Sequence, residues 1–327
     1  MDTNQSSTIA ALLAEERTVS PPAEFARQAN TGPEIYQQDP NEFWAANGRD
    51  RVTWFTPFDR LLEWEPPYAK WYLGGKLNVC YNCVDRHVEA GAGNKVAYHW
   101  EGEPADDRRS ITYADLQREV VRFANTLKTL GVRRGVPVAI YLGMVPELPV
   151  AMLACTRLGA PHTVVFGGFS ADSLSGRMND MGCQVLITQD EAWRRGNRIG
   201  LKATADEAMA AAPGVSSCLV VRRTGGEVSM TDGRDVWYHD ASTSVSDDPA
   251  SCPCEPMDSE DLLFLMYTSG TTARPKGIVH TTAGYLAFVN MTARLAFNLQ
   301  PGAGQLFWCS ADIGWVTGHS YVLYGIL

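Results

Sequence analysis

Eleven consecutive residues, 267–277 (YTSGTTARPKG), combine the side-chain types that bind a polyphosphate. Glycines leave the backbone free to bend past the phosphates, and hydroxyls can hydrogen-bond to phosphate oxygens. A lysine supplies positive charge to neutralise them. The segment therefore predicts a phosphate-binding loop, whose candidate residues are Thr268, Ser269, Gly270, Thr271, Thr272 and Lys276.

The order of residues in this loop differs from that of the usual mononucleotide P-loop. That pattern, GxxxxGK[ST], places lysine after its second glycine and continues into a helix. Here Lys276 precedes Gly277, and the residues KGIVH predict an extended strand. The order disfavours a P-loop kinase or ATPase. Composition alone leaves one alternative, a surface turn rich in serine and threonine.

Eight cysteines raise the question of a metal site or of disulfides. Cys80 and Cys83 have the spacing of half a zinc site, and His87 follows four residues later. The other half is missing, because the spacing of Cys252 and Cys254 is too tight for the usual zinc knuckle. Disulfides are not expected without a secretory signal. We therefore predict free thiols and no bound metal.

Composition and charge argue against several classes of partner. With 327 residues, 45% of them hydrophobic, the chain can form about two domains and bury a sizeable core. Its net charge of −9 argues against nucleic-acid binding, which requires a basic face. No apolar run approaches the roughly 18 residues of a membrane span. No membrane association and a cytoplasmic location are therefore expected.

The elements that must position the loop are predicted by hydrophobic periodicity. Residues 113–130 have helical spacing, with Thr112 as the N-cap and Gly131 as the stop. Strand–helix alternation predicts an α/β fold with a parallel sheet and helices on both faces. The expected strands are 136–142, 162–166, 184–188, 217–221, 261–267 and 305–310, and the expected helices are 113–130, 146–157, 171–181, 201–212 and 282–297.

Three regions predict irregular structure. The first thirty or so residues are polar and predict a loosely ordered segment or a lone helix. Residues 36–81 are crowded with aromatic side chains but lack long periodic segments, which predicts an irregular layer over a larger body. Residues 225–256 predict a long surface excursion before the strand of the phosphate loop.

The loop resembles the phosphate-loop signature of the adenylate-forming superfamily of acyl-CoA synthetases, luciferases and peptide-synthetase adenylation domains. Segments 70–87 (KWYLGGKLNVCYNCVDRH), 164–178 (VVFGGFSADSLSGRM) and 307–325 (FWCSADIGWVTGHSYVLYG) resemble AMP-forming acetyl-CoA synthetases. The resemblance extends from about residue 34 to the last residue. It implies the parallel-sheet, helix-flanked subdomains of the AMP-binding fold, with an N-terminal extension over residues 1–95 and an incomplete adenylation domain over residues 96–327.

The resemblance also implies a two-step reaction. An acetate oxygen attacks the α-phosphorus of ATP, which binds with Mg²⁺, and the coenzyme A thiolate then displaces AMP from acetyl-AMP. Acetate, ATP and coenzyme A are therefore the implied ligands. In this scheme the loop hydroxyls and Gly270 hold the β- and γ-phosphates, and Lys276 is the candidate catalytic residue that helps to neutralise them.

Two more groups of residues receive roles from the resemblance. The acyl pocket is formed by Trp315, Val316 and Thr317. The coenzyme A site is formed by Phe166, Gly167, Gly168, Arg194, Arg195, Gly196, Asn197 and Thr317. From the residues alone, an ordinary buried strand end is favoured for the first group, and a solvated turn is favoured for residues 194–198 of the second. His280 and His319 are expected to be satisfied structural histidines, because the chemistry requires no base.

This chain departs from the family's pattern at two positions. Ala273 stands where the family usually has glycine, so a stiffer or displaced loop tip is expected. Asn197 stands where the family often has a basic residue, so one phosphate contact is expected to be lost or to be taken over by Arg198.

The chain stops at residue 327, directly after an apolar segment, which predicts a cut through a domain. A missing C-terminal half is then the expected partner, residues 305–327 are expected to expose apolar surface, and the chain alone is expected to be inactive. The alternatives are a propionyl-CoA synthetase and a non-catalytic truncated remnant.

Overall fold

The computed structural model describes residues 18–268, 275–300, 302 and 304–327. Two units are distinguished, Met1–Gln38 and Asp39–Leu327, and each is described by itself. In the first unit, helix α2 (Ala23–Gln28) and the 3-10 helix η1 (Pro33–Gln37) contain no buried residue. All further elements belong to the second unit.

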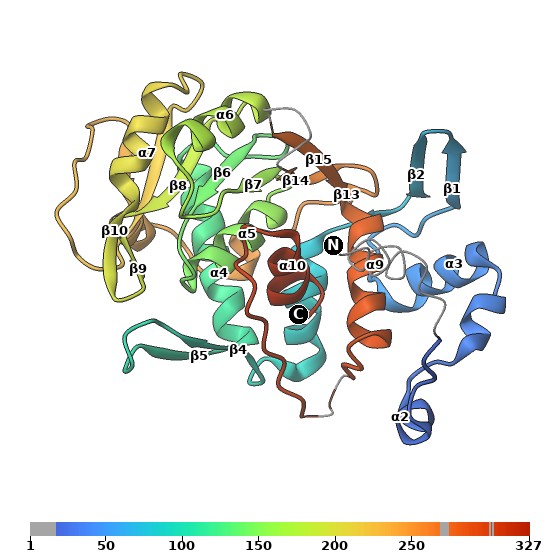
Figure 1. The fold of residues 1–327 in the computed structure, drawn as a ribbon. Coiled ribbons are helices and arrows are strands. Elements are labelled where there is room, and N and C mark those ends of the chain that lie inside the picture. The colour runs from blue at the N-terminus through green and yellow to red at the C-terminus, as the bar shows by residue number, and fades with distance from the viewer. Residues whose placement is uncertain (1–17, 269–274, 301, 303) are drawn as a thin grey trace, which may run out of the picture. The chain divides into compact units, whose positions relative to one another are not determined.

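A seven-stranded sheet carries the second unit (Figure 1). Its strands lie in the order β12-β11-β8-β6-β7-β14-β15, and all neighbouring pairs are parallel except β14–β15. The predicted α/β fold with a mainly parallel sheet is therefore confirmed. The strands are β6 (Val138–Tyr141), β7 (His162–Val164), β8 (Val185–Gln189), β11 (Ser217–Val221), β12 (Asp235–Trp237), β14 (Leu262–Thr268) and β15 (Lys276–Thr281).

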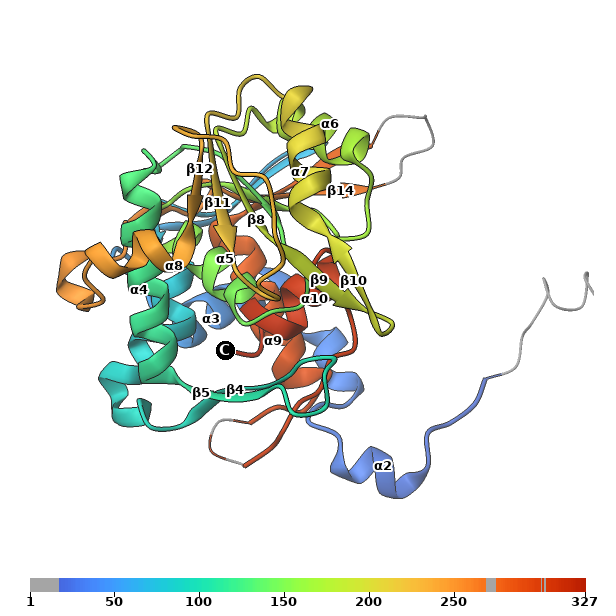
Figure 2. The same ribbon diagram turned by 90° about the vertical axis from the view of Figure 1, so that its left-hand side faces the viewer.

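Helices cover both faces of this sheet, as Figure 2 shows. Helices α4 and α5 pack against each other on one face, and α6 and α7 do so on the other. Alternate residues of β6 accordingly enter two separate buried clusters. Because both faces are covered, every residue of the central strands β6 and β8 is buried, as the continuous apolar runs predicted. The four helices are α4 (Tyr113–Thr129), α5 (Glu147–Arg157), α6 (Ala171–Met181) and α7 (Leu201–Ala210).

The ends of these helices follow local capping chemistry. The Thr112 hydroxyl accepts a hydrogen bond from the backbone N–H of Asp115 at 3.1 Å, and the Asp115 carboxylate accepts one from the N–H of Thr112 at 3.3 Å. This reciprocal capping box starts α4, and Gly131, with φ of 85°, follows its end. The same logic gives α6 a Ser170 N-cap and a Gly182 C-cap.

The remaining elements are hairpins, short pairs and helices. The strand pairs are β1 (Arg60–Glu65) with β2 (Tyr68–Leu73), β3 (Lys76–Leu77) with β13 (Met257–Asp258), β4 (Val96–Glu101) with β5 (Arg108–Thr112), and β9 (Glu191–Arg194) with β10 (Asn197–Gly200). The helices are α3 (Pro40–Arg51), α8 (Tyr238–Ala241), α9 (Thr282–Leu295), α10 (Val316–Gly318), the 3-10 turns η4 (Ser242–Ser244) and η5 (Pro249–Ser251), and the π-helical turns η2 (Tyr81–Asp85), η3 (Val88–Ala92) and η6 (His319–Tyr324). Across the described residues, no helix has both the length and the apolarity to cross a bilayer.

The expected surface excursion at 225–256 is wrong in part. Within it, β12 pairs in parallel with β11 and adds an edge strand to the sheet. Its first residue, Asp235, has a fully buried side chain, whose carboxylate lies 2.9 Å from the Nζ of the buried Lys202. A charged strand end can be buried here because its counter-charge is buried with it. The polar composition of residues 225–256 is the reason that the sequence did not predict β12.

The predicted strand at 305–310 is also wrong. No described strand pairs with it, and Leu306 and Trp308 are 78% and 83% exposed. A strand requires a neighbour for its backbone N–H and C=O groups, so apolar composition alone does not form one. Apolar exposure was expected in residues 305–327, and these two side chains show it, as do Trp315 and Val316.

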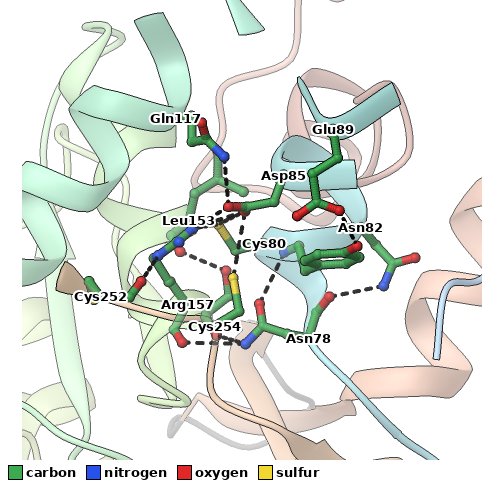
Figure 3. Close-up of polar contacts among 12 residues, drawn as sticks. Asn78, Cys80, Asn82, Asp85, Glu89, Gln117, Leu153, Arg157, Cys252 and Cys254 are labelled. Carbon is green, nitrogen blue, oxygen red and sulfur yellow. Dashed lines mark hydrogen bonds and ion pairs between the residues drawn. The ribbon is translucent and has the colours of Figure 1, made fainter. Parts of the chain in front are cut away.

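A buried ion pair connects several of these elements (Figure 3). Arg157, at the end of α5, is 2% exposed, and its Nη1 lies 2.9 Å from both carboxylate oxygens of Asp85. Gln117 of α4 donates to the same carboxylate at 2.9 Å, and Arg157 Nε donates to the carbonyl of Cys252 at 2.6 Å. The pair therefore joins η2, α4, α5 and the segment before β13.

Asp85→Asn is expected to lower the free energy of unfolding by about 3–5 kcal/mol, because it leaves a buried guanidinium without its counter-charge. The matched control is Asp247→Asn, which removes an ion pair to Arg122 whose side chains are 41% and 37% exposed. That change is expected to cost less than about 1 kcal/mol. Urea unfolding followed by circular dichroism measures both values, and equal losses would contradict the assigned role of Asp85.

Candidate functional site

A pocket of about 260 Å³ lies at the carboxyl ends of the neighbouring strands β8, β6 and β7. Gln189, Gly143 and Phe166 line it, and each lies at or just beyond the end of one of these strands. In open α/β sheets, ligands bind in the crevice at this edge. The pocket also includes Gly167, Gly168 and Arg194, which the sequence assigned to the coenzyme site.

The turn 166–169 is shaped to accept an arginine. The buried Tyr141 hydroxyl lies 3.2 Å from the carbonyl oxygen of Gly167 and 2.9 Å from that of Phe169, and holds the turn in place. The Arg194 guanidinium lies over the Phe166 ring, with its Cζ 4.8 Å from the ring centroid. A Cβ at Gly168 would lie 2.2 Å from Arg194 Nη1 and 2.6 Å from Phe166 Cε1, so a larger residue would have to displace the guanidinium and the ring from this arrangement.

The other predicted coenzyme residues lie at the tip of the β9–β10 hairpin. Arg195 and Gly196 have φ of 53° and 76°, which gives the hairpin its tight turn, and both are exposed together with Asn197. The backbone N–H of Gly196 donates to the Glu103 carboxylate in the β4–β5 loop. Of the predicted basic cluster, Arg194 lines the pocket, and Arg195, Gly196 and Asn197 do not.

The lining of the pocket carries charges of both signs, three carboxylates and two arginines. Its three carboxylates, Glu101, Glu103 and Asp312, already have partners, namely an arginine for the first and backbone N–H groups for the others. Burial raises the pKa of Asp312. In contrast, Arg194 has no carboxylate within 4 Å in the part of the chain that the structure describes. Its charge is therefore available to a ligand.

The predicted acyl residues lie beside this pocket. The Trp315 ring lies 6.2 Å from the Phe166 ring and 6.3 Å from the Phe169 ring, measured between centroids. Trp315 is 51% exposed and Val316 44%, and Thr317 is also exposed, so they do not form a buried strand end. They belong to the start of the short helix α10.

The phosphate-loop residues are described only at the base of the loop. Thr268 and Lys276 are cross-strand partners at the end of the β14–β15 hairpin from which the connecting loop leaves, and both are exposed. The strand after the loop therefore pairs as predicted. Four candidate phosphate-binding residues, and the alanine that differs from the family's pattern, lie outside the described residues. They are Ser269, Gly270, Thr271, Thr272 and Ala273.

Arg177 of α6 connects the base of this loop to the aromatic residues near the pocket. Its guanidinium Cζ lies 5.4 Å from the Tyr267 ring centroid and 4.9 Å from that of Phe169, which contacts Trp315. The Tyr267 hydroxyl donates to Asp180 at 2.7 Å. The structure thus brings the end of β14 and the residues predicted to bind the acyl group and the coenzyme into one contiguous network.

Sequence reasoning missed several pocket residues. Trp100, Met144, Arg223 and Asp312 line the pocket but come from separate segments with no shared spacing. Arg223 lies two residues after the strand expected at 217–221. Its position near the end of a strand was the one signal in the sequence that could have placed it in the pocket. Trp100 is on a hairpin that no motif marked.

One group of described side chains has ligand atoms close enough for a metal ion. Cys80, Asp85 and Cys254 have theirs within 4.8 Å of one another. The carboxylate is already bound by the Arg157 guanidinium, whose positive charge opposes a cation at this point. Cys83, which shares the predicted zinc spacing, instead has its sulfur 3.7 Å from the carbonyl of Tyr324. The arrangement fits a structural cluster better than a metal site.

A family model described as AMP-binding enzyme matches residues 84–327. The chain belongs to the AMP-binding enzyme family. A second model, described as acetyl-coenzyme A synthetase N-terminus, matches residues 34–83 directly before it.

Relatives with the name acetyl-coenzyme A synthetase align with almost all of this chain. That of Rubrobacter xylanophilus is 51% identical over 96% of the chain, and that of Streptomyces avermitilis is 52% identical over 98%. That of Mycobacterium bovis is 54% identical over 94%. The alignments cover 48%, 49% and 47% of these relatives, so the chain spans about half their length.

Two histidines are fully buried close to the acyl residues. A ring nitrogen of His162 lies 2.9 Å from the Tyr324 hydroxyl, and Nδ1 of His319 lies 3.2 Å from the Trp315 carbonyl. The expectation of a fully satisfied His319 is wrong, because its Nε2 and the Nδ1 of His162 have no hydrogen-bond partner among the described residues. Burial lowers the pKa of His162 to about 3 and that of His319 to about 4.

These lowered pKa values predict acid destabilisation. In the unfolded chain both histidines bind a proton near pH 6.5, whereas in the folded chain they resist it, so their stabilisation is present above pH 6.5 and is lost as pH falls toward 4 and 3. Each contributes a slope of about 1.4 kcal/mol per pH unit within that window. His162→Gln should reduce the slope of unfolding free energy between pH 6.5 and 5, measured by urea titration. The exposed His99→Gln serves as control, and an unchanged slope in His162→Gln would refute the prediction.

Proposed function

We propose that this chain supplies ATP-, acyl- and coenzyme-binding residues of an ATP-dependent acetate–CoA ligase. The reaction converts acetate, ATP and coenzyme A to acetyl-CoA, AMP and diphosphate through acetyl-AMP. One observation carries the proposal: a match to the acetyl-coenzyme A synthetase N-terminus is followed without a gap by a match to the AMP-binding enzyme family. For the domains, we propose an extension over residues 1–95 and an adenylation domain over residues 96–327.

The first step requires positioning and charge neutralisation. Acetate attacks the α-phosphorus and diphosphate leaves, with no covalent enzyme intermediate. The hydroxyls of Thr268, Ser269, Thr271 and Thr272 and the backbone at Gly270 would hold the β- and γ-phosphates. Lys276 would neutralise charge on the departing diphosphate; its exposed position opposite Thr268 at the hairpin mouth supports this role. Mg²⁺, which enters with ATP, would supply further positive charge to the phosphates.

The second step requires coenzyme A to reach the acyl group. The nucleotide end would lie over Phe166, Gly167 and Gly168, with its phosphate at Arg194, which has no ion-pair partner among the described residues. Arg195, Gly196 and Asn197 would provide contacts from the exposed hairpin tip. Contact between the Phe166 and Trp315 rings supports a continuous path from the nucleotide end to the acyl group.

The acyl group would be bound by Trp315, Val316 and Thr317. Trp315 would separate the carboxylate pocket from the pantetheine path, while the Val316 side chain limits the length of the acyl chain. Thr317 would line both sites. The cytoplasmic location expected from the sequence remains part of this proposal.

The adenylation half-reaction tests the proposed function. Residues 1–327 are joined to the second half of the Mycobacterium bovis relative, and acetate-dependent ATP–diphosphate exchange is measured. Lys276→Ala is expected to reduce exchange by about 10²–10³-fold, because such charge-stabilising groups typically contribute this much. Lys70→Ala, at an exposed lysine of β2, is the matched control and should retain activity. Exchange that does not depend on acetate, or that survives Lys276→Ala, would overturn the proposal.

Acyl selectivity tests the assignment of Val316. In the same fusion, Val316→Ala should shift the ratio of kcat/KM for propionate over acetate by about tenfold or more, because one methylene in a pocket is worth roughly 1–3 kcal/mol. The exposed Val279→Ala on β15 is a control of the same chemical change. An unchanged ratio in Val316→Ala would remove this residue from the acyl pocket.

A further inference from the structure

Trp100 lines the pocket, and contacts within the protein hold its side chain in place before any ligand binds. It belongs to β4, and its indole Nε1 donates to the carbonyl of Met144 at 2.9 Å. The Arg223 guanidinium lies against its ring, with Cζ 5.2 Å from the ring centroid. Arg223 is itself held by an ion pair with Asp107. The polar edge of the indole and its position are thereby set without a ligand.

The other aromatic rings of the pocket are less firmly anchored by the protein. Like Trp100, Phe166 has a guanidinium near its ring, that of Arg194 at 4.8 Å, but its side chain has no polar atom through which a hydrogen bond could fix it. Trp193 has Arg198 at 5.0 Å, but its indole N–H has no hydrogen-bond acceptor among the described residues. Trp100 is therefore the aromatic surface in this pocket that is best anchored by the protein.

We propose that Trp100 is the stacking surface for the adenine base of coenzyme A, with Arg223 as the residue that positions the indole. This inference rests on the proposed function and deepens it. The nucleotide end of coenzyme A combines a purine with phosphates, and the pocket combines a fixed indole with the guanidinium of Arg194, which has no ion pair among the described residues. Because the indole is already ordered, stacking costs little side-chain entropy.

The probe is adenosine 3′,5′-bisphosphate, titrated calorimetrically into the 327-residue chain. Trp100→Ala is expected to weaken binding by about 5–150-fold, since base–aromatic stacking is worth about 1–3 kcal/mol per base. Trp100→Phe keeps a ring and should retain most of the affinity. Trp64→Ala, at a tryptophan that is 60% exposed on β1, is the matched control and should bind as the unaltered chain does. Thermal melts of each variant check folding, and Trp100→Phe keeps the test valid if the alanine variant fails to fold.

Separate outcomes distinguish this inference from the proposed function. Binding that Arg194→Ala weakens but Trp100→Ala does not would overturn the role of Trp100 and leave the coenzyme site in place. No binding to the unaltered chain would overturn both. ATP forms a second arm: if ATP displaces the probe and loses the same affinity in Trp100→Ala, the surface accepts purine nucleotides in general, and its assignment to coenzyme A is wrong.

Discussion

The buried ion pair of Arg157 and Asp85 is the constraint on which the arrangement of the second unit depends. Asp85 lies within two residues of the boundary between the two family matches, which end at residue 83 and begin at residue 84. Its carboxylate binds a guanidinium from α5 and an amide from α4, two helices that cover one face of the sheet. A buried charge is tolerated only with all its partners present. The pair therefore fixes the position of η2 against α4 and α5.

The sequence predicted those parts of the fold that depend on local chemistry. Helix α4 could be bounded at both ends because Thr112 and Gly131 act within their own turn of the chain. Strands such as β6 were visible because both of their faces are buried. The strand β12 was not visible, because its burial depends on a lysine more than thirty residues away. The strand predicted at 305–310 was wrong for a different reason: the segment is apolar, but apolar composition does not provide a neighbouring strand to pair with.

The candidate site shows the same division. The resemblance named Phe166, Gly168 and Arg194, and the structure brings them together at one sheet edge. It could not name Trp100, whose contact with the pocket depends on how the β4–β5 hairpin packs, or Arg223, which follows β11 but belongs to no motif. Spacing along the chain carries no information about such contacts. Motifs therefore predicted the residues closest to the strand ends, and tertiary packing supplied the surrounding wall.

The shared volume of Gly168 and Arg194 also restricts how this site can change during evolution. A side chain at position 168 would meet the guanidinium at 2.2 Å and expel it from the Phe166 ring. While the arginine remains stacked, a larger residue at position 168 must displace it; without the arginine, the Phe166 ring still restricts the position, because its Cε1 would lie 2.6 Å from the same Cβ. The two positions are thus epistatic, with non-additive effects of substitution. Related chains that keep the arginine in its stacked position are therefore expected to keep the glycine.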